Sequence, residues 1–276
     1  MPPSSPALRR RRLGRTELIV TELGLGAMDT PGSPEADATI RAAIGAGIDF
    51  VDTAREYTGS EFLLGQAIRE AGHAPFRVAS KTFSHNVNGS QRDVDRSLAV
   101  LGVERIDLYQ LHDIRTPAAW AEVMGEDGAL EGLQIARDRG LIDHIGISSH
   151  SLDILELAID CGEFDTVMLE YSAFYPQTAA LIERARERDV GVIVMRPVGG
   201  SGRTSVMRGR IAEGYSGPLT PANLLRYVLS NPGVSVAIPG ASYPSRIVEN
   251  AATAASYEPM PPDEQRALEA EAAALY

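Results

Sequence analysis

The chain has 276 residues, of which 44% are hydrophobic and 23% charged, and its formal net charge is -11 at pH 7. This composition is that of a globular protein and excludes disorder over most of the length, while the negative charge opposes binding to nucleic acid or to anionic membrane surfaces. Cys161 is the only cysteine, which excludes an intrachain disulfide and a cysteine-based metal site.

The first residues are rich in proline and serine, and we expect residues 1–8 to be disordered. The arginines at 9–12 are expected to form a solvated basic edge. No apolar region follows this basic start, and nowhere do about 18 apolar residues run without interruption. We therefore expect a cytoplasmic protein with neither a membrane nor a nucleic acid as its partner, while the oligomeric state stays open.

The first predicted element is a β-hairpin. Residues 11–13 and 18–20 are short segments of strand character, and the turn residues 14–17 (Gly-Arg-Thr-Glu) lie between them. Since this hairpin precedes the first strand of the repeating pattern described next, we expect it to cover the bottom of the main domain.

From about residue 21 onward, short runs rich in valine and isoleucine alternate with longer segments of helical periodicity. This alternation is typical of parallel βα units. Strands are expected at 22–27, 48–52, 77–81, 106–111, 144–148, 166–170, 190–195 and 234–239. Helices are expected at 35–46, 60–70, 91–101, 130–139, 152–160, 177–188, 221–230 and 244–255. N-terminal helix signals occur at Ser60, at Ser151, and at Thr220 followed by Pro221.

Eight strand–helix pairs predict a closed (β/α)8 TIM barrel, an α/β fold of about 250 residues. No shift in composition marks a domain boundary, so we expect residues 1–276 to form a single domain. A doubly wound open sheet has the same alternation. Such a sheet, when it binds dinucleotides, carries a glycine-rich turn after its first strand, and segment 24–28 lacks the third glycine of that motif. The barrel is therefore the favoured prediction.

Three successive predicted strands end in side chains suited to catalysis: Asp52, Lys81 and His112. Since active sites of barrel enzymes lie at the C-terminal ends of the strands, these side chains should converge at the barrel mouth. Tyr57 follows Asp52 closely enough to bend over the same mouth. Each residue alone has an ordinary structural explanation, such as a helix cap, a solvated lysine or a packed ring. Together they form an acid–base set.

The expected chemistry of this set is proton transfer. An unperturbed tyrosine has a pKa of about 10 and exchanges protons poorly near neutrality. We expect Lys81 to lower the pKa of Tyr57 by stabilising the phenolate, with Asp52 holding Lys81 charged and oriented. His112 is then placed to donate to, or position, a carbonyl oxygen. One imidazole and one carboxylate do not make a metal site, so no metal is expected.

The segments that hold these residues resemble the aldo-keto reductases, whose catalytic tetrad is Asp, Tyr, Lys and His. The likeness rests on segments 52–57, 79–82 and 107–113, and it extends from Leu13 to Asn250. It implies a bacterial-type, NADP-dependent oxidoreductase in which Asp52, Tyr57, Lys81 and His112 are catalytic. The implied reaction is hydride transfer from NADPH to an aldehyde or ketone carbonyl, with Tyr57 protonating the oxygen, or the reverse alcohol oxidation.

The resemblance also implies that the cofactor lies extended across the barrel mouth, which accounts for the missing glycine-rich motif. On the nicotinamide side, the implied contacts are Gly26, Ala27, Met28, Asp52, Ser148, Ser149, Met168, Met195, Arg196 and Pro197. Three of them depart from the usual pattern: Ser149 stands for an asparagine, Met168 for an amide-binding glutamine, and Met195 for an aromatic residue that stacks on the nicotinamide.

On the adenosine-phosphate side, the implied contacts are Gly240, Arg246, Glu249 and Asn250. Arg246 matches the family arginine that binds the 2′-phosphate and stacks on adenine, a task suited to a guanidinium. Gly240 and Ala241 replace the lysine and serine that add 2′-phosphate contacts in some relatives. NADPH is therefore the expected cofactor, with NADH as an open alternative.

Two other functions are compatible with the pattern. A regulatory barrel would bind the cofactor with little turnover, and a lyase or isomerase barrel would form a Schiff base through Lys81. The intact tetrad favours the reductase. The substrate is expected to be a small carbonyl compound, and its identity depends on loops at 113–127 and 199–218, of which the second is expected to be flexible and solvated.

Overall fold

The computed structural model describes residues 7–72 and 75–275, apart from the side chain of residue 201. Most of the N-terminal stretch that was expected to be disordered, residues 1–6, lies outside the described residues. Leu8, at the end of that stretch, is half-buried and packs against the main apolar cluster of the protein.

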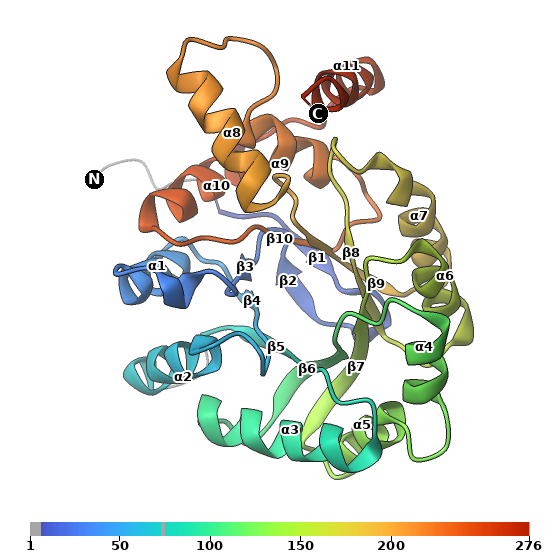
Figure 1. Cartoon of the computed structure of the whole chain (residues 1–276). Coiled ribbons are helices and arrows are strands. Elements are labelled where there is room, and N and C mark those ends of the chain that lie inside the picture. The colour runs from blue at the N-terminus through green and yellow to red at the C-terminus, as the bar shows by residue number, and fades with distance from the viewer. Residues whose placement is uncertain (1–6, 73–74, 276) are drawn as a thin grey trace.

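The centre of the molecule is an eight-stranded parallel sheet in which the strands follow one another in chain order. Its strands are β3 (Leu25–Gly26), β4 (Phe50–Asp52), β5 (Arg77–Thr82), β6 (Ile106–Leu111), β7 (Ile142–Ser148), β8 (Thr166–Glu170), β9 (Gly191–Met195) and β10 (Val236–Ile238). Bridges from Leu23 to Ala237 and from Gly26 to Gly240 join the first strand to the last. The predicted (β/α)8 barrel is therefore confirmed, and an open sheet is excluded (Figure 1).

The helices surround this barrel, as Figure 1 shows. The predicted ones are α1 (Ala36–Gly45), α2 (Ser60–Ala71), α3 (Val87–Leu101), α5 (Ala129–Asp138), α6 (Leu152–Cys161), α7 (Ala179–Glu187), α9 (Pro221–Leu229) and α10 (Pro244–Ser256). Two predicted caps are confirmed, because the hydroxyls of Ser151 and Thr220 accept hydrogen bonds from backbone N–H groups three residues ahead. The expected cap at Ser60 is wrong: Gly59 precedes the helix, and the Ser60 hydroxyl donates to the Ala27 carbonyl instead.

Other helices lie outside the eight predicted strand–helix pairs. They are α4 (Pro117–Met124), α8 (Gly200–Ala212) and α11 (Pro262–Ala273), with short 3-10 turns η1 (Gly14–Thr16), η2 (Thr30–Gly32) and η3 (Pro176–Thr178). The expectation of a flexible loop at 199–218 is wrong, since most of that segment forms α8. Glycine is unfavourable in helices, so the glycines in this segment predicted a loop instead of a helix.

The N-terminal hairpin closes the bottom of the barrel. Its strands β1 (Arg10–Arg12) and β2 (Ile19–Thr21) pair antiparallel, and Leu13 between them is fully buried against interior residues such as Phe50 and Leu108. Gly14 adopts a φ of +53°, and a Cβ there would come within 2.1 Å of the Gly191 nitrogen, so the hairpin touches the start of β9 directly. The prediction that a hairpin covers the barrel bottom is confirmed.

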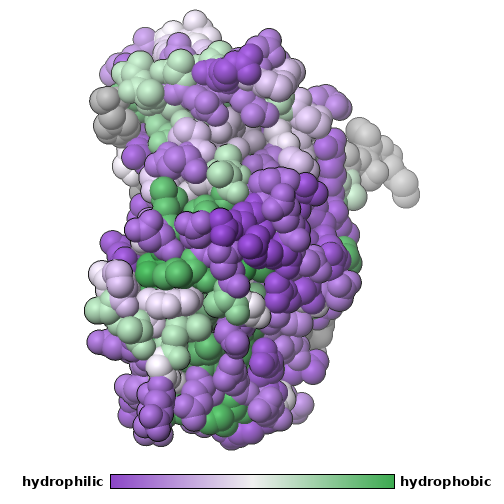
Figure 2. Space-filling view, turned by 90° about the vertical axis from the view of Figure 1, so that its right-hand side faces the viewer, coloured by the Kyte–Doolittle hydropathy of each residue, from purple (hydrophilic) through white to green (hydrophobic). Residues whose placement is uncertain are grey.

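The outer face seen in Figure 2 is mostly hydrophilic, with smaller hydrophobic areas between the polar side chains. Scattered apolar residues of this kind are normal on a surface that faces water. Within residues 7–72 and 75–275, no helix combines the length and the apolar character that crossing a bilayer requires.

Candidate active site

A large pocket of about 1370 Å³ opens at the C-terminal ends of the barrel strands. Most of the residues implied by the family resemblance line it: Gly26, Met28, Asp52, Tyr57, His112, Ser148, Met168, Met195, Arg196, Pro197, Gly240, Arg246 and Asn250. The other predicted residues, Ala27, Lys81, Ser149 and Glu249, are not among the lining residues. The fold thus brings sequence-distant residues of both predicted cofactor ends to one continuous cavity.

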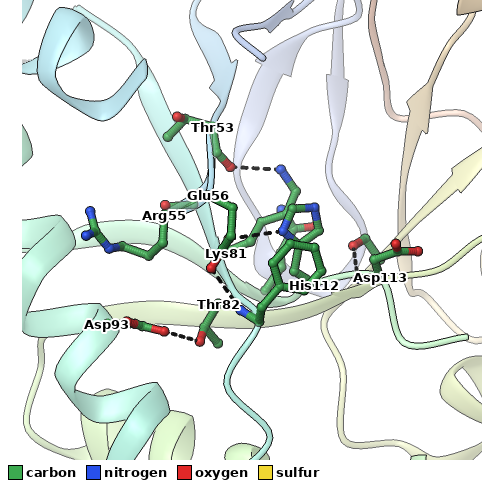
Figure 3. Close-up of polar contacts among 12 residues, drawn as sticks. Thr53, Arg55, Glu56, Lys81, Thr82, Asp93, His112 and Asp113 are labelled. Carbon is green, nitrogen blue, oxygen red and sulfur yellow. Dashed lines mark hydrogen bonds and ion pairs between the residues drawn. The ribbon is translucent and has the colours of Figure 1, made fainter. Parts of the chain in front are cut away.

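Lys81 and Asp52 form a fully buried ion pair beneath the pocket. The Lys81 ammonium donates to Asp52 Oδ1 at 2.5 Å. It also donates to the Thr53 carbonyl at 2.8 Å (Figure 3). Gln110 donates to the other carboxylate oxygen at 3.2 Å. Burial is the largest influence on both charges: it lowers the pKa of Lys81 and raises the pKa of Asp52, although each charge stabilises the other. The charged pair thus lies next to the ring of Tyr57.

The strand that carries Lys81 is fixed by a buried carboxylate on α2. Glu61 accepts hydrogen bonds from the hydroxyls of Ser80 at 2.7 Å and Ser97 at 2.6 Å, and it pairs with Arg55. Ser80 is the residue immediately before Lys81 in β5. Because these partners come from different elements, the network holds the strand end against the surrounding helices, which keeps the ammonium in a fixed place.

Tyr57 lies in the loop between β4 and α2 with its ring near the buried pair. The Lys81 ammonium is 4.8 Å from the ring centroid. Burial, followed by the negative charges of Asp52 and Glu56, raises the pKa of Tyr57 above its usual value. The expected net lowering of this pKa is not found, because burial and the charges of Asp52 and Glu56 outweigh the effect of the Lys81 ammonium. The phenol stays protonated, as a proton donor must.

His112 follows β6 directly and is held on several sides. Its ring stacks on Phe83 with centroids 4.1 Å apart and meets Tyr57 edge-on at 5.5 Å. Its Nδ1 lies 3.3 Å from Glu56 Oε2 (Figure 3). Burial is the largest influence on this imidazole and lowers its pKa, against the effect of Glu56, so the site favours the neutral ring.

The two serines after Ile147 have different surroundings. Ser148 lines the pocket, and its hydroxyl accepts from the Asp113 backbone N–H at 2.8 Å. Ser149 is fully buried, and its hydroxyl donates to the Ile114 carbonyl at 2.5 Å and accepts from the Ser151 N–H at 2.9 Å. Ser149 therefore stabilises a turn and does not face the pocket, whereas Ser148 does.

On the opposite side of the mouth, Arg196 stands at the end of β9 in a left-handed conformation with a φ of +52°. Backbone of this kind is unusual outside glycine and is concentrated at functional sites. Its guanidinium pairs with Glu170 at 3.2 Å. Arg203 of α8 and His150 reach the same carboxylate at 3.4 Å and 3.5 Å, so one buried acid joins β8, β9 and α8.

At the far end of the pocket, two guanidiniums converge on Glu249 of α10. Arg208 of α8 reaches it at 2.8 Å and Arg246 at 3.1 Å. Both arginines lower the pKa of Glu249, although burial, the largest single influence, acts the other way. The Nε of Arg208 is buried and has no hydrogen-bond partner among the described residues. Here, therefore, two cations share one anion.

Sequence reasoning did not assign a role to several pocket residues. These are Asp29, Glu56, Phe83 and His150, whereas Asp113, Arg115, Arg203 and Arg208 lie in the two segments on which the substrate was expected to depend. A place in the pocket could have been predicted for Glu56 and Phe83, because each lies within two positions of a tetrad residue. Arg208 lies in segment 199–218, which was expected to be a flexible, solvated loop, so its fixed place on α8 was not foreseen.

Comparisons with known proteins agree with this geometry. The sequence profile described as "Aldo/keto reductase family" matches residues 22–214. L-galactose dehydrogenase of Arabidopsis thaliana is 27% identical over 300 aligned positions, which cover 95% of this chain and 93% of that protein. A solved Pseudomonas aeruginosa structure assigned to the aldo-keto reductases has a TM-score of 0.74 at 26% identity, covering 89% of this chain and 94% of its own.

A Klebsiella pneumoniae aldo-keto reductase crystallised with NADP and acetate has a similar fold, with a TM-score of 0.75 at 23% identity over 96% of this chain and 95% of its own. At that identity the likeness concerns the fold alone. The profile match, by contrast, covers more than half of the sequence, including the strands that carry Asp52, Lys81 and His112. The chain belongs to the aldo-keto reductase family.

Proposed function

We propose that this oxidoreductase uses NADPH to reduce an aldehyde or ketone, and that it oxidises the corresponding alcohol in reverse. The observation that carries the proposal is the shared pocket: Tyr57 and His112 line one part of it, and Arg208 and Arg246 line another. Asp52, Tyr57, Lys81 and His112 are the proposed catalytic residues. L-galactose dehydrogenase, named for an oxidation, supports the reverse direction.

The lining fits a phosphorylated dinucleotide. Small-molecule pockets are usually about 300–1,000 Å³, and this one is about 1370 Å³, which leaves room for a cofactor and a substrate together. NADPH bound here would supply the hydride. Arg246 is proposed to bind the 2′-phosphate, with Glu249 and Asn250 near the adenine. The Klebsiella pneumoniae relative, solved with NADP, supports a nicotinamide cofactor.

For the nicotinamide end, we propose contacts from Ser148, Met168 and Met195, which all line the pocket. Met168 and Met195 pack in the upper layer of the barrel interior, where a polarisable thioether suits a flat ring. The backbone of 26–28 and of 196–197 completes this part of the proposed cofactor site. Ser149, which is turned into the fold, is left out of the proposal.

The proposed proton donor is the Tyr57 hydroxyl. Because its phenol remains protonated, it carries the proton to the oxygen of the reduced carbonyl, and the buried ammonium of Lys81 stabilises the phenolate left behind. Asp52 keeps that ammonium charged and oriented. His112, beside Tyr57, positions the carbonyl oxygen.

Schiff-base chemistry on Lys81 is disfavoured by its surroundings. Its ammonium is fully buried, bonded to Asp52 and Thr53, and absent from the pocket lining. A lysine that attacks a carbonyl must instead meet the substrate as a free amine. Treatment with borohydride and a carbonyl compound is therefore expected to leave Lys81 unmodified.

The proposed function is tested in two steps. Quenching of protein fluorescence on titration with NADPH and with NADH measures the two dissociation constants. Loss of the absorbance of the reduced nicotinamide is then followed with a panel of aldehydes and ketones. Binding of NADPH followed by turnover supports the reductase, binding without turnover supports a regulatory barrel, and absence of binding contradicts both.

A further inference from the structure

Glu56 places a carboxylate against the imidazole of His112. Its side chain, about one third exposed, comes from the loop that also carries Tyr57. Oε2 lies 3.3 Å from His112 Nδ1 (Figure 3), and Oε1 accepts from the Phe83 backbone N–H at 3.3 Å. Both carboxylate oxygens are therefore engaged, which fixes the group in front of one particular ring nitrogen.

The imidazole cannot easily turn away from this carboxylate. Phe83 stacks on its face with an interplanar angle of 13°, and Tyr57 meets it at 80°. The His112 backbone N–H donates to the Thr82 carbonyl at 2.9 Å, which fixes the main chain. In the part of the chain that the structure describes, no residue bonds to Nε2. Nε2 is thus the nitrogen left for a substrate.

The chemistry of the pair limits the proton positions on His112. An ionised carboxylate only accepts hydrogen bonds, so the nitrogen that faces it must carry a proton. A neutral imidazole with its proton on Nε2 would turn the lone pair of Nδ1 toward Glu56, and two acceptors would then oppose each other. The remaining states are the neutral ring protonated on Nδ1 and the imidazolium.

We propose that Glu56 is a positioning residue that keeps a proton on His112 Nδ1. As a result, Nε2 donates a hydrogen bond to a carbonyl oxygen only when the ring is an imidazolium. In the neutral ring, Nε2 accepts a hydrogen bond from an alcohol. This inference rests on the proposed carbonyl–alcohol chemistry. It assigns the two directions of the reaction to two protonation states of one side chain.

The groups that face His112 set the pH at which these states exchange. Burial, the largest influence, and the ammonium of Lys81 oppose the imidazolium, whereas Glu56 and Asp52 favour it. Asp113, next in the chain, is paired with Arg115 at 2.6 Å. Carbonyl reduction is therefore favoured on the acid side of the His112 transition and alcohol oxidation on the alkaline side.

The tautomer is measured directly by NMR of protein with 15N-labelled histidine. The chain has 5 histidines, and the signals of His112 are identified by their loss in His112→Asn. We expect neutral His112 to carry its proton on Nδ1. In Glu56→Gln, the side-chain amide offers both a donor and an acceptor, so the population should shift toward the Nε2-protonated form. A wild-type His112 protonated on Nε2 would overturn the inference.

The pH dependence of kcat/KM for carbonyl reduction gives a second readout. In the wild type it should fall by roughly tenfold per pH unit above the His112 pKa, because the donor at Nε2 is lost. Glu56→Gln allows the neutral ring to donate from Nε2, so this fall should flatten to about twofold or less over the same range. An unchanged slope in Glu56→Gln would contradict the proposed role.

A second histidine–carboxylate pair provides the control. His85 Nδ1 lies 2.6 Å from Glu122 Oε2 outside the tetrad. Glu122→Gln should change the NMR signals of His85 and leave the pH profile of reduction unaltered. Since the tautomer is measured without turnover, a wild type that reduces no carbonyl would contradict the proposed function, while the proton position on His112 would still decide the role of Glu56.

Discussion

Lys81 donates a hydrogen bond of 2.5 Å to Asp52 at a depth where the two side chains are 0% and 3% exposed. A charge in such a place needs its counter-charge, and breaking a buried pair by removing one partner costs about 3–5 kcal/mol. We expect Asp52→Asn to lower the free energy of unfolding by about this amount, measured by urea denaturation.

The matched control for this prediction removes both charges. Lys81→Met in the Asp52→Asn background takes away the stranded ammonium and fills its volume with apolar atoms, so part of the lost stability should return. Both variants should be inactive as reductases. A double variant that is no more stable than Asp52→Asn would show that the charge of Lys81 is not what destabilises the single variant.

Tyr57→Phe removes the proposed proton donor and retains the ring that lies over Lys81. Positioned acids contribute about 10²–10⁴-fold to rate, so kcat for carbonyl reduction should fall by a factor in that range. The dissociation constant of NADPH should change little, because the hydroxyl serves the transition state. Steady-state kinetics and fluorescence titration check the two parts, and normal turnover by the variant would exclude Tyr57 as the acid.

Much of the fold and of the tetrad follows from local sequence patterns. Strands such as β4 and β9 are almost entirely buried, so they appear as short apolar runs, and the ends of the predicted strands indicate the residues at the barrel mouth. Asp52 and His112 were found in this way, since each lies at the end of a predicted strand.

What could not be predicted depends on contacts between distant segments. Glu56 meets His112 across 56 positions, and Arg208 meets Glu249 across 41. The direction of the Tyr57 pKa shift was also missed, because it depends on burial and on carboxylates whose distances no sequence pattern gives. Motifs identify residue types at strand ends, but the balance of charges around them requires coordinates.

Arg208 is expected to act with Arg246 on the 2′-phosphate of NADPH. Both guanidiniums line the pocket and share Glu249. From α8, Arg208 can make a 2′-phosphate contact in place of those lost where Gly240 and Ala241 replace a lysine and a serine. A charged hydrogen bond contributes about 1.5–3 kcal/mol, so Arg208→Ala should weaken NADPH binding by about tenfold or more. The affinity for NADH, which lacks that phosphate, should change by less than about twofold.

The same helix offers a control for this prediction. Arg210 is exposed and does not line the active-site pocket, so Arg210→Ala removes an equal charge from α8 at a different place. Fluorescence titrations of both variants with both cofactors should show selective loss of NADPH affinity only in Arg208→Ala. Equal weakening of NADPH and NADH in Arg208→Ala would mean that this arginine does not bind the 2′-phosphate.

Glu170 should make the stability of the barrel mouth sensitive to acid. Burial alone would raise its pKa, but His150, Arg196 and Arg203 lower it below the ordinary value. The folded state therefore releases this proton more readily than the unfolded chain, and the stabilisation is complete above the unfolded pKa of about 4.3 and is lost as the pH falls through the folded pKa. Glu170→Gln should reduce the free energy of unfolding by about 1–3 kcal/mol at pH 7, and the difference from the wild type should shrink below pH ~4.

Glu183→Gln is the control, because Glu183 forms an exposed pair with Arg186 that solvent screens, and it should leave stability unchanged at every pH. Urea denaturation at several pH values separates these outcomes, and a Glu170→Gln deficit that stayed constant down to the acid limit would show that the carboxylate charge does not stabilise this site.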